Sequence, residues 1–337
     1  MAWVEEADGV FRGGGVKGLG IAGALEGFAA DARYPIKRWV NVAGASAGAI
    51  IASFLAVKRA QGVADLAKLL EDMPFASFED YPRGGRILGG VPNLFRNHGM
   101  ARGETFRKWM DEQLGGATFA DVRAEHGQSR LKMVTVDVTN SQLLLLPDDL
   151  PLYRLPDSDK PIDPWSFPIS SAVRMSMSIP YLFEPVQLVR VGTTATAELI
   201  DGGTLSNFPV WIFDVDPAEG GQRPSRLTFG FTLSGGRSVG DAGGILKIAP
   251  WPARFGVEIV RTAMSAWDAR FASHSTRVRT VVIDALDVGT TEFKLTPEKR
   301  QALIDSGRKA AADFLAKFEP AKAVNTHGAK PEFVERA

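Results

Sequence analysis

The sequence predicts an α/β fold with three α/β/α layers and a mostly parallel central sheet. Short apolar segments with a strand pattern alternate with longer segments with a helix pattern along the chain. Such alternation is typical of parallel strands joined by helices that cover both faces of a sheet. The 337 residues show no internal repeat, and their apolar content of 45% is enough for a sizeable core.

The expected elements follow one another in a regular order. The strand segments are 10–12, 39–43, 131–138, 142–146, 197–200, 227–233 and 279–283. The helix segments are 19–30, 47–61, 63–71, 103–114, 167–177, 254–273 and 297–318. We expect them to form a single domain over residues 1–320, followed by a polar tail over residues 321–337.

One segment between the predicted helices has no regular pattern. Residues 73–100 are rich in Gly, Pro and Arg, and this composition fits either a mobile cover over a functional site or a plain surface loop. The apolar side chains scattered through its second half are Ile87, Leu88, Val91, Leu94 and Phe95.

The overall composition excludes several classes of protein. Basic and acidic residues balance at 39 each, so there is no global field that would attract nucleic acid or an anionic membrane. Cysteine is absent, the first residues lack the pattern of a signal peptide, and no apolar run is long enough for a transmembrane helix. We therefore expect a cytoplasmic protein. No acidic or histidine cluster has the spacing of a calcium or zinc site, so no metal is expected.

A serine lies in a glycine-flanked turn between a strand segment and a helix segment. Ser46 is the centre of Gly44-Ala45-Ser46-Ala47-Gly48, a Gly-x-Ser-x-Gly sequence. Glycines remove the side chains that would clash where a strand turns sharply into a helix, and the serine hydroxyl is pushed out near the amide-rich helix start. The pattern predicts a nucleophile, although a helix that merely begins with small residues would have the same composition.

A second glycine-rich segment lies upstream, at residues 13–18 (GGGVKG), between a strand segment and a helix segment. Consecutive glycines leave backbone N–H groups able to point at an anion. The segment also fits the dinucleotide fingerprint, but that site needs an acidic residue at the end of the second strand. The second strand instead runs into Gly44 and Ser46, and Asp31 lies before it. A Walker A sequence does not occur.

The third motif is Asp201-Gly202-Gly203, which follows the strand segment 197–200. A carboxylate at a strand end, followed by two glycines, lies on backbone that other groups can approach closely. Taken alone, the same residues would also suit a plain turn, because Asp-Gly is a common turn dipeptide.

Together and in this order, the three motifs resemble the patatin-like phospholipases, which have a glycine-rich oxyanion loop, a Gly-x-Ser-x-Gly elbow and a later Asp-Gly-Gly or Asp-Gly-Ala. Residues 174–183 (RMSMSIPYLF) and 201–210 (DGGTLSNFPV) also resemble family segments. The resemblance extends over residues 9–215 and fades beyond. Lys17 stands where arginine is also common, and lysine keeps the charge but not the planar fork.

The resemblance implies a patatin-like fold and a serine acyl hydrolase with a Ser–Asp dyad that needs no metal or cofactor. Asp201 accepts the proton of Ser46, which attacks the ester. The amides of Gly14 and Gly15 hold the oxyanion, with Lys17 adding positive charge. The other implied site residues are Gly13 and Gly18 in the loop, Gly44 and Gly48 at the elbow, and Gly202 and Gly203 after the aspartate.

A histidine-based triad is the main alternative to the dyad. Of the four histidines, only His274 follows Asp201 in a setting that would complete the chain order Ser, Asp, His of the α/β-hydrolases. In that fold, however, the elbow normally comes after several strands, whereas Ser46 follows one strand and one helix. The early elbow favours the dyad. The other histidines are His98, His126 and His327.

The expected activity is therefore hydrolysis of acyl esters of phospholipids or other lipids, with acyl transfer or thioester cleavage as close relatives. A non-catalytic or regulatory protein that keeps the scaffold is the alternative from a different class. The expected partners are a lipid or ester substrate and, transiently, a membrane surface, but no nucleic acid. Head group, chain length and oligomeric state do not follow from the sequence.

Overall fold

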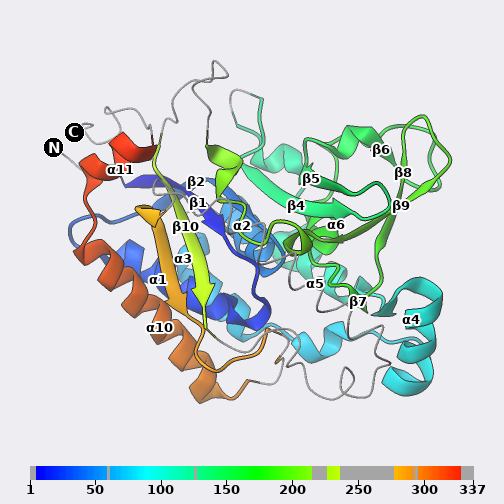
Figure 1. The fold of residues 1–337 in the computed structure, drawn as a ribbon, viewed down its shortest axis with the longest axis horizontal. Helices are drawn as coiled ribbons and strands as arrows, with labels where there is room; N and C mark the ends of the chain where they lie inside the picture. The colour runs from blue at the N-terminus through cyan, green and yellow to red at the C-terminus, as the bar shows by residue number, and fades with distance from the viewer. Residues whose placement is uncertain are drawn as a thin grey trace.

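The structure, a computed structural model, describes residues 5–58, 61–124, 127–214, 226–235, 277–290, 292 and 295–327. Its centre is a nine-stranded sheet with the order β11-β10-β1-β2-β4-β9-β8-β6, and β5 pairs with β4 outside this path. Figure 1 shows α10 and α11 beside one end of the sheet and the antiparallel strands β6, β8 and β9 at the other.

The sheet has a parallel half and an antiparallel wing that meet at β4. The parallel strands are β1 (Glu6–Phe11), β2 (Arg38–Gly44), β4 (Leu131–Asp137), β10 (Thr228–Ser234) and β11 (Thr280–Asp284). The wing contains β5 (Gln142–Leu146), β6 (Tyr153–Arg154), β8 (Val186–Arg190) and β9 (Thr196–Asp201). Because β8 is antiparallel to β9, which is antiparallel to β4, β8 runs in the direction of the parallel half. The predicted fold class, with its mostly parallel sheet, is confirmed.

Apolar side chains are buried on both faces of the parallel half, as expected for strands covered on both sides. One face packs against helices: α2 contacts β1, β2 and β4, α6 contacts β4 and β9, and α10 contacts β11 and α1. On the other face, Val10 and Ala43 pack with Val210. The helices are α1 (Gly18–Ala30), α2 (Ala47–Lys58), α3 (Gln61–Glu71), α5 (Glu104–Leu114), α6 (Ile169–Ser176), α10 (Pro297–Ala316) and α11 (Pro320–His327).

The register of β4 brings the ends of β2 and β9 together. Met133 pairs with Gly44 of β2 on one edge and with β5 on the other. Thr135 pairs with Asp201 of β9 and, again, with β5. Since a strand has only two edges, β2 and β9 share the edge opposite β5. They run in opposite directions and end at neighbouring positions along it.

A second, small sheet lies beside this junction. Its strands β3 (Gly99–Ala101) and β7 (Tyr181–Phe183) are parallel. The chain reaches β3 through α4 (Val91–Asn97), which projects from the lower right of Figure 1. Residues 73–100 are therefore partly helical.

Each strand segment predicted from the sequence corresponds to a strand, and the predicted helix at 254–273 lies outside the described residues. The sequence did not predict β3, β6, β7 and β8, because strands of two to five residues show too little periodicity. The start of the predicted polar tail also differs, because α11 covers Pro320–His327 and buries Ala323 and Val324.

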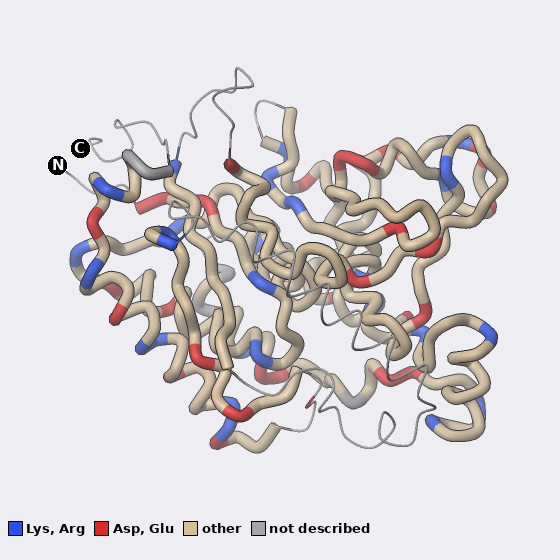
Figure 2. Tube along the Cα trace, viewed as in Figure 1, with Lys and Arg blue, Asp and Glu red and all other residues tan. Residues whose placement is uncertain are grey.

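No described helix combines the length and the apolar character that crossing a bilayer would require. Lysine, arginine, aspartate and glutamate are interspersed along most of the described chain (Figure 2).

Candidate active site

Ser46 lies at a sharp turn between the end of β2 and the start of α2. Its φ of 53° is in the left-handed region, which is uncommon for a residue with a side chain and is typical of functional positions. A Cβ on Gly44 would lie 2.3 Å from the carbonyl carbon of Gly48, and one on Gly48 would lie 2.0 Å from the carbonyl oxygen of Phe11. Only glycine fits at both positions, so the motif forms the strained elbow that the sequence predicts.

The Ser46 hydroxyl lies close enough to the carboxylate of Asp201 to lower its pKa as a hydrogen-bond donor, and both residues are buried. Asp201 ends β9, so the convergence of β2 and β9 on one edge of β4 accounts for the contact. Asp201 Oδ1 also accepts the N–H of Gly203 at 2.7 Å. Gly202 follows at a close approach, where a Cβ would lie 2.1 Å from the carbonyl oxygen of Val134.

Burial raises the pKa of Asp201 from 3.8 to about 7, against the opposing effect of the hydrogen bonds from Ser46 and Gly203. A general base works best with a pKa near the operating pH, because it then accepts a proton readily while a large fraction is ionised. The environment of Asp201 therefore suits proton transfer at neutral pH.

The glycine-rich loop packs directly on the elbow. A Cβ on Gly13 would lie 3.0 Å from the Ser46 Cβ and 2.3 Å from Asn207 Oδ1. Gly13 is clamped at both ends, since its N–H donates to the Asn207 carbonyl at 3.0 Å and its own carbonyl accepts Asn207 Nδ2–H at 3.3 Å. Gly15 adopts a φ of 57°, with no room for a Cβ beside the carbonyl of Thr290.

Most backbone N–H groups of this loop have acceptors. The Val16 N–H donates to the Thr290 carbonyl at 3.3 Å, the Lys17 N–H to Gly14 at 3.3 Å, and the Gly18 N–H to the carbonyls of Gly15 and Val16. Within the described part of the chain, the N–H groups of Gly14 and Gly15 donate to no acceptor. Two adjacent donors beside the elbow can receive an oxyanion.

Lys17 adds a buried cation to the loop. Burial lowers the pKa of its ammonium, and the nearby charge of Arg12 lowers it further. Arg12 is held on β10, where its guanidinium donates to Thr232 Oγ1 at 3.2 Å and to the Leu233 carbonyl at 3.3 Å. The sequence did not indicate Arg12, which directly precedes the glycine run.

The end of α6 supplies further site residues that the sequence did not assign. Ser176 Oγ accepts the N–H of Ser46 at 3.1 Å, and the Ser178 carbonyl accepts the N–H of Asp201 at 2.8 Å. Buried Arg174 donates to Ser178 Oγ at 2.6 Å. These residues lie in the segment 174–183, whose resemblance to the family carried no role for individual side chains. Asn207 was likewise missed.

His98 is the one histidine whose side chain the structure describes, and it does not lie at this site. The exposed His98 ring pairs with the Glu198 carboxylate at 3.0 Å. His126 and His274 lie outside the described residues, and the side chain of His327 is also not described.

A dinucleotide site would need an acidic residue at the end of β2, and this strand ends in Val42, Ala43 and Gly44. Asp31 caps the turn after α1 instead, where Oδ1 accepts the N–H groups of Arg33 and Tyr34, both at 2.8 Å. The described residues contain no group of three side chains that would hold a metal.

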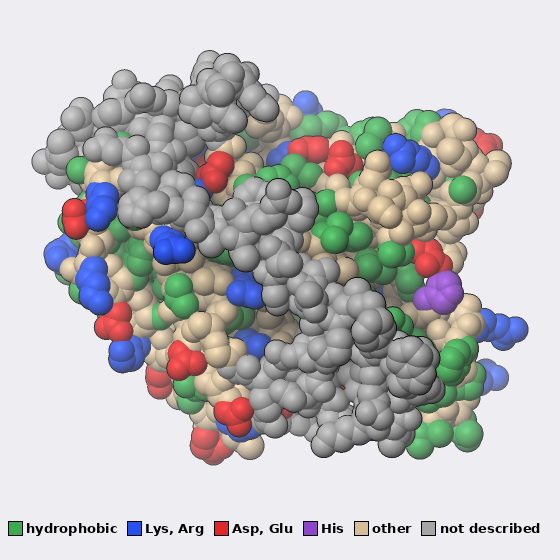
Figure 3. Space-filling view, in the orientation of Figure 1, with side chains coloured by type: hydrophobic (Ala, Val, Ile, Leu, Met, Phe, Trp, Pro, Cys, Tyr) green, Lys and Arg blue, Asp and Glu red, His purple; other side chains and the backbone are tan. Residues whose placement is uncertain are grey.

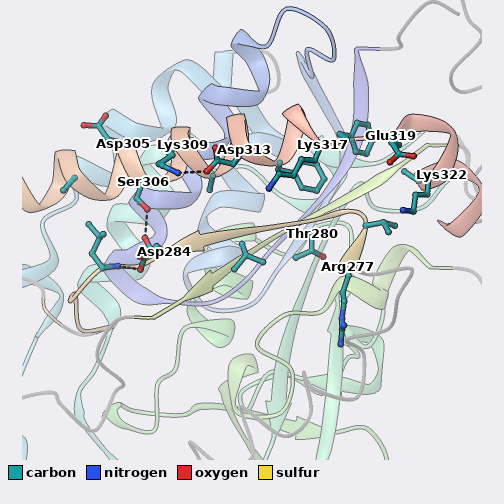
Figure 4. Close-up of a pocket in the computed structure, with 18 residues that line it drawn as sticks. Arg277, Thr280, Asp284, Asp305, Ser306, Lys309, Asp313, Lys317, Glu319 and Lys322 are labelled. Carbon is teal, nitrogen blue, oxygen red and sulfur yellow. Dashed lines mark hydrogen bonds and ion pairs between the residues drawn. The ribbon is translucent and has the colours of Figure 1, made fainter.

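A cavity of about 890 Å³ lies elsewhere, between β11 and α10 (Figure 4). Two pairs of its lining residues bond to each other: Lys309 pairs with Asp313 at 2.6 Å, and Ser306 Oγ donates to the Asp284 carbonyl at 2.7 Å. None of the predicted site residues lines it. The candidate active site is thus the junction of β1, β2 and β9.

The comparisons with known proteins identify the family of this chain. The family model for patatin-like phospholipases matches residues 9–214, which include the glycine-rich loop, the elbow and Asp201. The chain belongs to the patatin-like phospholipase family. It is 34% identical over 322 residues to the uncharacterized protein YqhO of Bacillus subtilis (strain 168), with 92% of this chain and 98% of YqhO covered.

A solved structure, that of VipD, shares the fold of this chain. The structure of VipD from Legionella pneumophila superimposes with a TM-score of 0.54 at 18% identity, over 94% of this chain and 69% of VipD. ExoU of the Pseudomonas aeruginosa type III secretion system, in complex with SpcU, matches with a TM-score of 0.45 at 14% identity, over 94% of this chain and 53% of ExoU.

Proposed function

We propose that this patatin-like protein is a serine acyl hydrolase that cleaves acyl esters of phospholipids or other lipids, with Ser46 as nucleophile and Asp201 as general base. The observation that carries the proposal is the position of the Ser46 hydroxyl beside the buried carboxyl group of Asp201, whose pKa is raised to about 7. A serine hydroxyl needs a base within hydrogen-bond reach, and this carboxylate provides one.

In the first half-reaction, Ser46 Oγ forms a bond to the ester carbonyl carbon while its proton passes to Asp201. The negative charge that develops on the carbonyl oxygen is received by the N–H groups of Gly14 and Gly15, near the charge of Lys17. Loss of one such donor typically costs about 3 kcal/mol of transition-state stabilisation. The tetrahedral intermediate then breaks its bond to the leaving alcohol, which takes the proton from Asp201.

The second half-reaction regenerates the enzyme. A water molecule gives its proton to Asp201 as its oxygen attacks the acyl-serine carbonyl. The acyl–Oγ bond breaks, the fatty acid leaves, and Ser46 recovers the proton. Both halves need only one base, because Asp201 gives up each proton before it takes the next.

A fluorophosphonate probe tests the proposal, because it reacts with activated serines. The parent protein should be labelled, and Ser46→Ala should not be labelled. A panel of p-nitrophenyl esters and defined phospholipids should then reveal hydrolysis by the parent. Undiminished labelling of Ser46→Ala would place the nucleophile elsewhere. Absence of both labelling and hydrolysis in the parent would favour the non-catalytic scaffold.

A further inference from the structure

One surface of the molecule exposes apolar side chains to an unusual degree. Ile87, Leu88 and Phe95 are 76%, 77% and 75% exposed, whereas the next large hydrophobic residue of the described chain, Val282, is 56% exposed. Val91 lies between them along the chain and is exposed as well. Single exposed apolar residues are normal, but a group of them marks an interaction site.

These side chains form one face of a short helical projection. They lie on a π-helical turn (Arg86–Gly90) and on α4 (Val91–Asn97), which continue into each other. The positions 87, 88, 91 and 95 are spaced by one, three and four residues, which places them on the same side of a helix. We call Ile87, Leu88, Val91 and Phe95, together with the arginines described next, the α4 patch.

The patch is basic as well as apolar. Arg83, Arg86 and Arg96 are exposed beside it, and residues 81–98 contain no aspartate or glutamate, although the whole chain has 39 residues of each sign. Among the described residues, none of the three arginines forms an ion pair with a carboxylate. Hydrophobic and basic side chains lie together over α4 at the lower right of Figure 3.

The projection is held firmly to the active-site end of the wing. Asn93 is buried, and its Nδ2 donates to the Gly99 carbonyl at 2.7 Å and to Glu184 Oε1 at 2.6 Å. The β3–β7 pairing joins the projection to the chain just after Ser178, and the hydrogen bond between the His98 ring and the Glu198 carboxylate joins it to β9 before Asp201. The apolar side chains are thus exposed as they stand, on an attachment that leads directly to both members of the proposed dyad.

We propose that the α4 patch docks the protein on an anionic lipid bilayer. Apolar side chains flanked by arginines suit the boundary between acyl chains and anionic head groups. A second copy of this chain suits the patch less well, because a symmetric contact would place each set of arginines against its own equivalent. Docking would bring the Ser46 site to aggregated lipid, and this consequence alone rests on the proposed function.

Vesicle binding tests the proposal without any hydrolysis. Full-length Ser46→Ala protein is sedimented with vesicles of phosphatidylcholine and phosphatidylglycerol in equal parts, or of phosphatidylcholine alone. The protein should bind the anionic vesicles, and the added changes Ile87→Ser/Leu88→Ser/Phe95→Ser should weaken binding by about tenfold or more. The changes Arg83→Gln/Arg86→Gln/Arg96→Gln should have a similar effect on anionic vesicles at low salt.

The matched control changes three exposed apolar residues outside the patch, as Val138→Ser/Leu152→Ser/Val191→Ser, and should bind like its parent. Circular dichroism and the melting temperature of each variant show whether it folds. Equal vesicle binding by the Ser46→Ala protein and by both folded patch variants made from it would overturn the proposal. A dimer of the Ser46→Ala protein, detected by light scattering, would also overturn the proposal if the triple serine change dissociates the dimer and the protein binds no vesicles.

A monomeric ester separates docking from chemistry. When the patch changes are made in protein that retains Ser46, the variants should hydrolyse short p-nitrophenyl esters at the rate of the unmutated protein. They should lose activity only on anionic vesicles. If the parent hydrolyses nothing but Ser46→Ala still binds vesicles through the patch, the docking proposal stands and the proposed function fails. If hydrolysis occurs but the patch variants bind and cleave vesicles like the parent, only the docking proposal fails.

Discussion

The parallel half and the antiparallel wing contribute different parts of the candidate site. The parallel half supplies the elbow after β2 and the glycine-rich loop after β1, both of which are backbone features built from glycine. The wing supplies Asp201 on β9, and the chain at the end of α6, a helix that contacts β4 and β9, supplies the anchoring residues. These are side chains and a carbonyl held in place by long-range contacts. Neither half alone contains a complete site, and the parts of the site come together only along β4.

The strongest test of the parallel half is Ser46→Ala. We expect ester hydrolysis to fall by several powers of ten, because no other group replaces the nucleophile. Rates on p-nitrophenyl esters and a circular dichroism spectrum, which should stay unchanged, provide the measurement. Residual activity above about one hundredth of the parental rate would contradict the assignment.

The corresponding test of the wing is Asp201→Asn. The amide keeps the shape and can still accept the Gly203 N–H, but it cannot take a proton at neutral pH, so the loss should be nearly as large. His274→Ala, the control for a triad, should retain activity within a few-fold. An inactive His274→Ala protein beside an active Asp201→Asn protein would replace the dyad with a histidine-based mechanism.

The pH dependence of kcat/KM should follow the ionisation of Asp201, the residue that the wing contributes. The base must be ionised to accept the serine proton, and its pKa is raised to about 7. Activity should therefore fall about tenfold per pH unit below this value and reach a plateau above it. The profile is measured on an uncharged ester. A plateau that extends unchanged to pH 5 would show that another group, or an Asp201 with an ordinary pKa, is the base.

A smaller effect is expected from Lys17→Met, which keeps the buried aliphatic stem and removes the charge. If the charge stabilises the developing oxyanion, kcat should fall by about tenfold to a hundredfold while KM changes little. Steady-state kinetics on a neutral ester distinguish the two parameters. A rise in KM at constant kcat would instead assign Lys17 to substrate binding.

The smallest effect concerns the contact between the two halves. Ser176→Ala removes the acceptor for the Ser46 N–H, so kcat should drop several-fold with the pH midpoint unchanged, and Ser176→Thr should restore most of it. Ser170→Ala is the matched control, because it removes another buried serine hydrogen bond of α6, to Asp111 at 2.7 Å, away from the dyad. Equal kcat losses in both alanine variants would reduce Ser176 to a structural role.

The sequence predicted the parallel half better than the wing, for a physical reason. The elbow and the oxyanion loop are local, since glycines close together in the chain create them, and the strands that lead into them end in short apolar runs. Ser176 lies 130 residues from the Ser46 that it supports, and Asn207 lies 194 residues from Gly13. No pattern along the chain encodes such pairings. The short strands that carry the wing show equally little periodicity.

The apolar residues of the α4 patch could be identified in the sequence, but their attachment to the rest of the fold could not. The sequence shows the apolar residues of segment 73–100 and is compatible with either a mobile cover or a plain surface loop. The firm attachment through Asn93 depends on Glu184, which belongs to the segment after β7. Because β7 itself is three residues long, its pairing with β3 gave no signal in the sequence.

Ser176 and Ser178 lie two residues apart at the end of α6, and each accepts a hydrogen bond from the backbone N–H of one member of the proposed dyad. The proposed nucleophile and the proposed base are therefore both anchored to the same short segment of chain. When thermal motion displaces the end of α6, both partners are carried in the same direction, and their separation changes much less than their positions. The geometry of the proposed proton transfer is thus protected against thermal displacement of the end of α6.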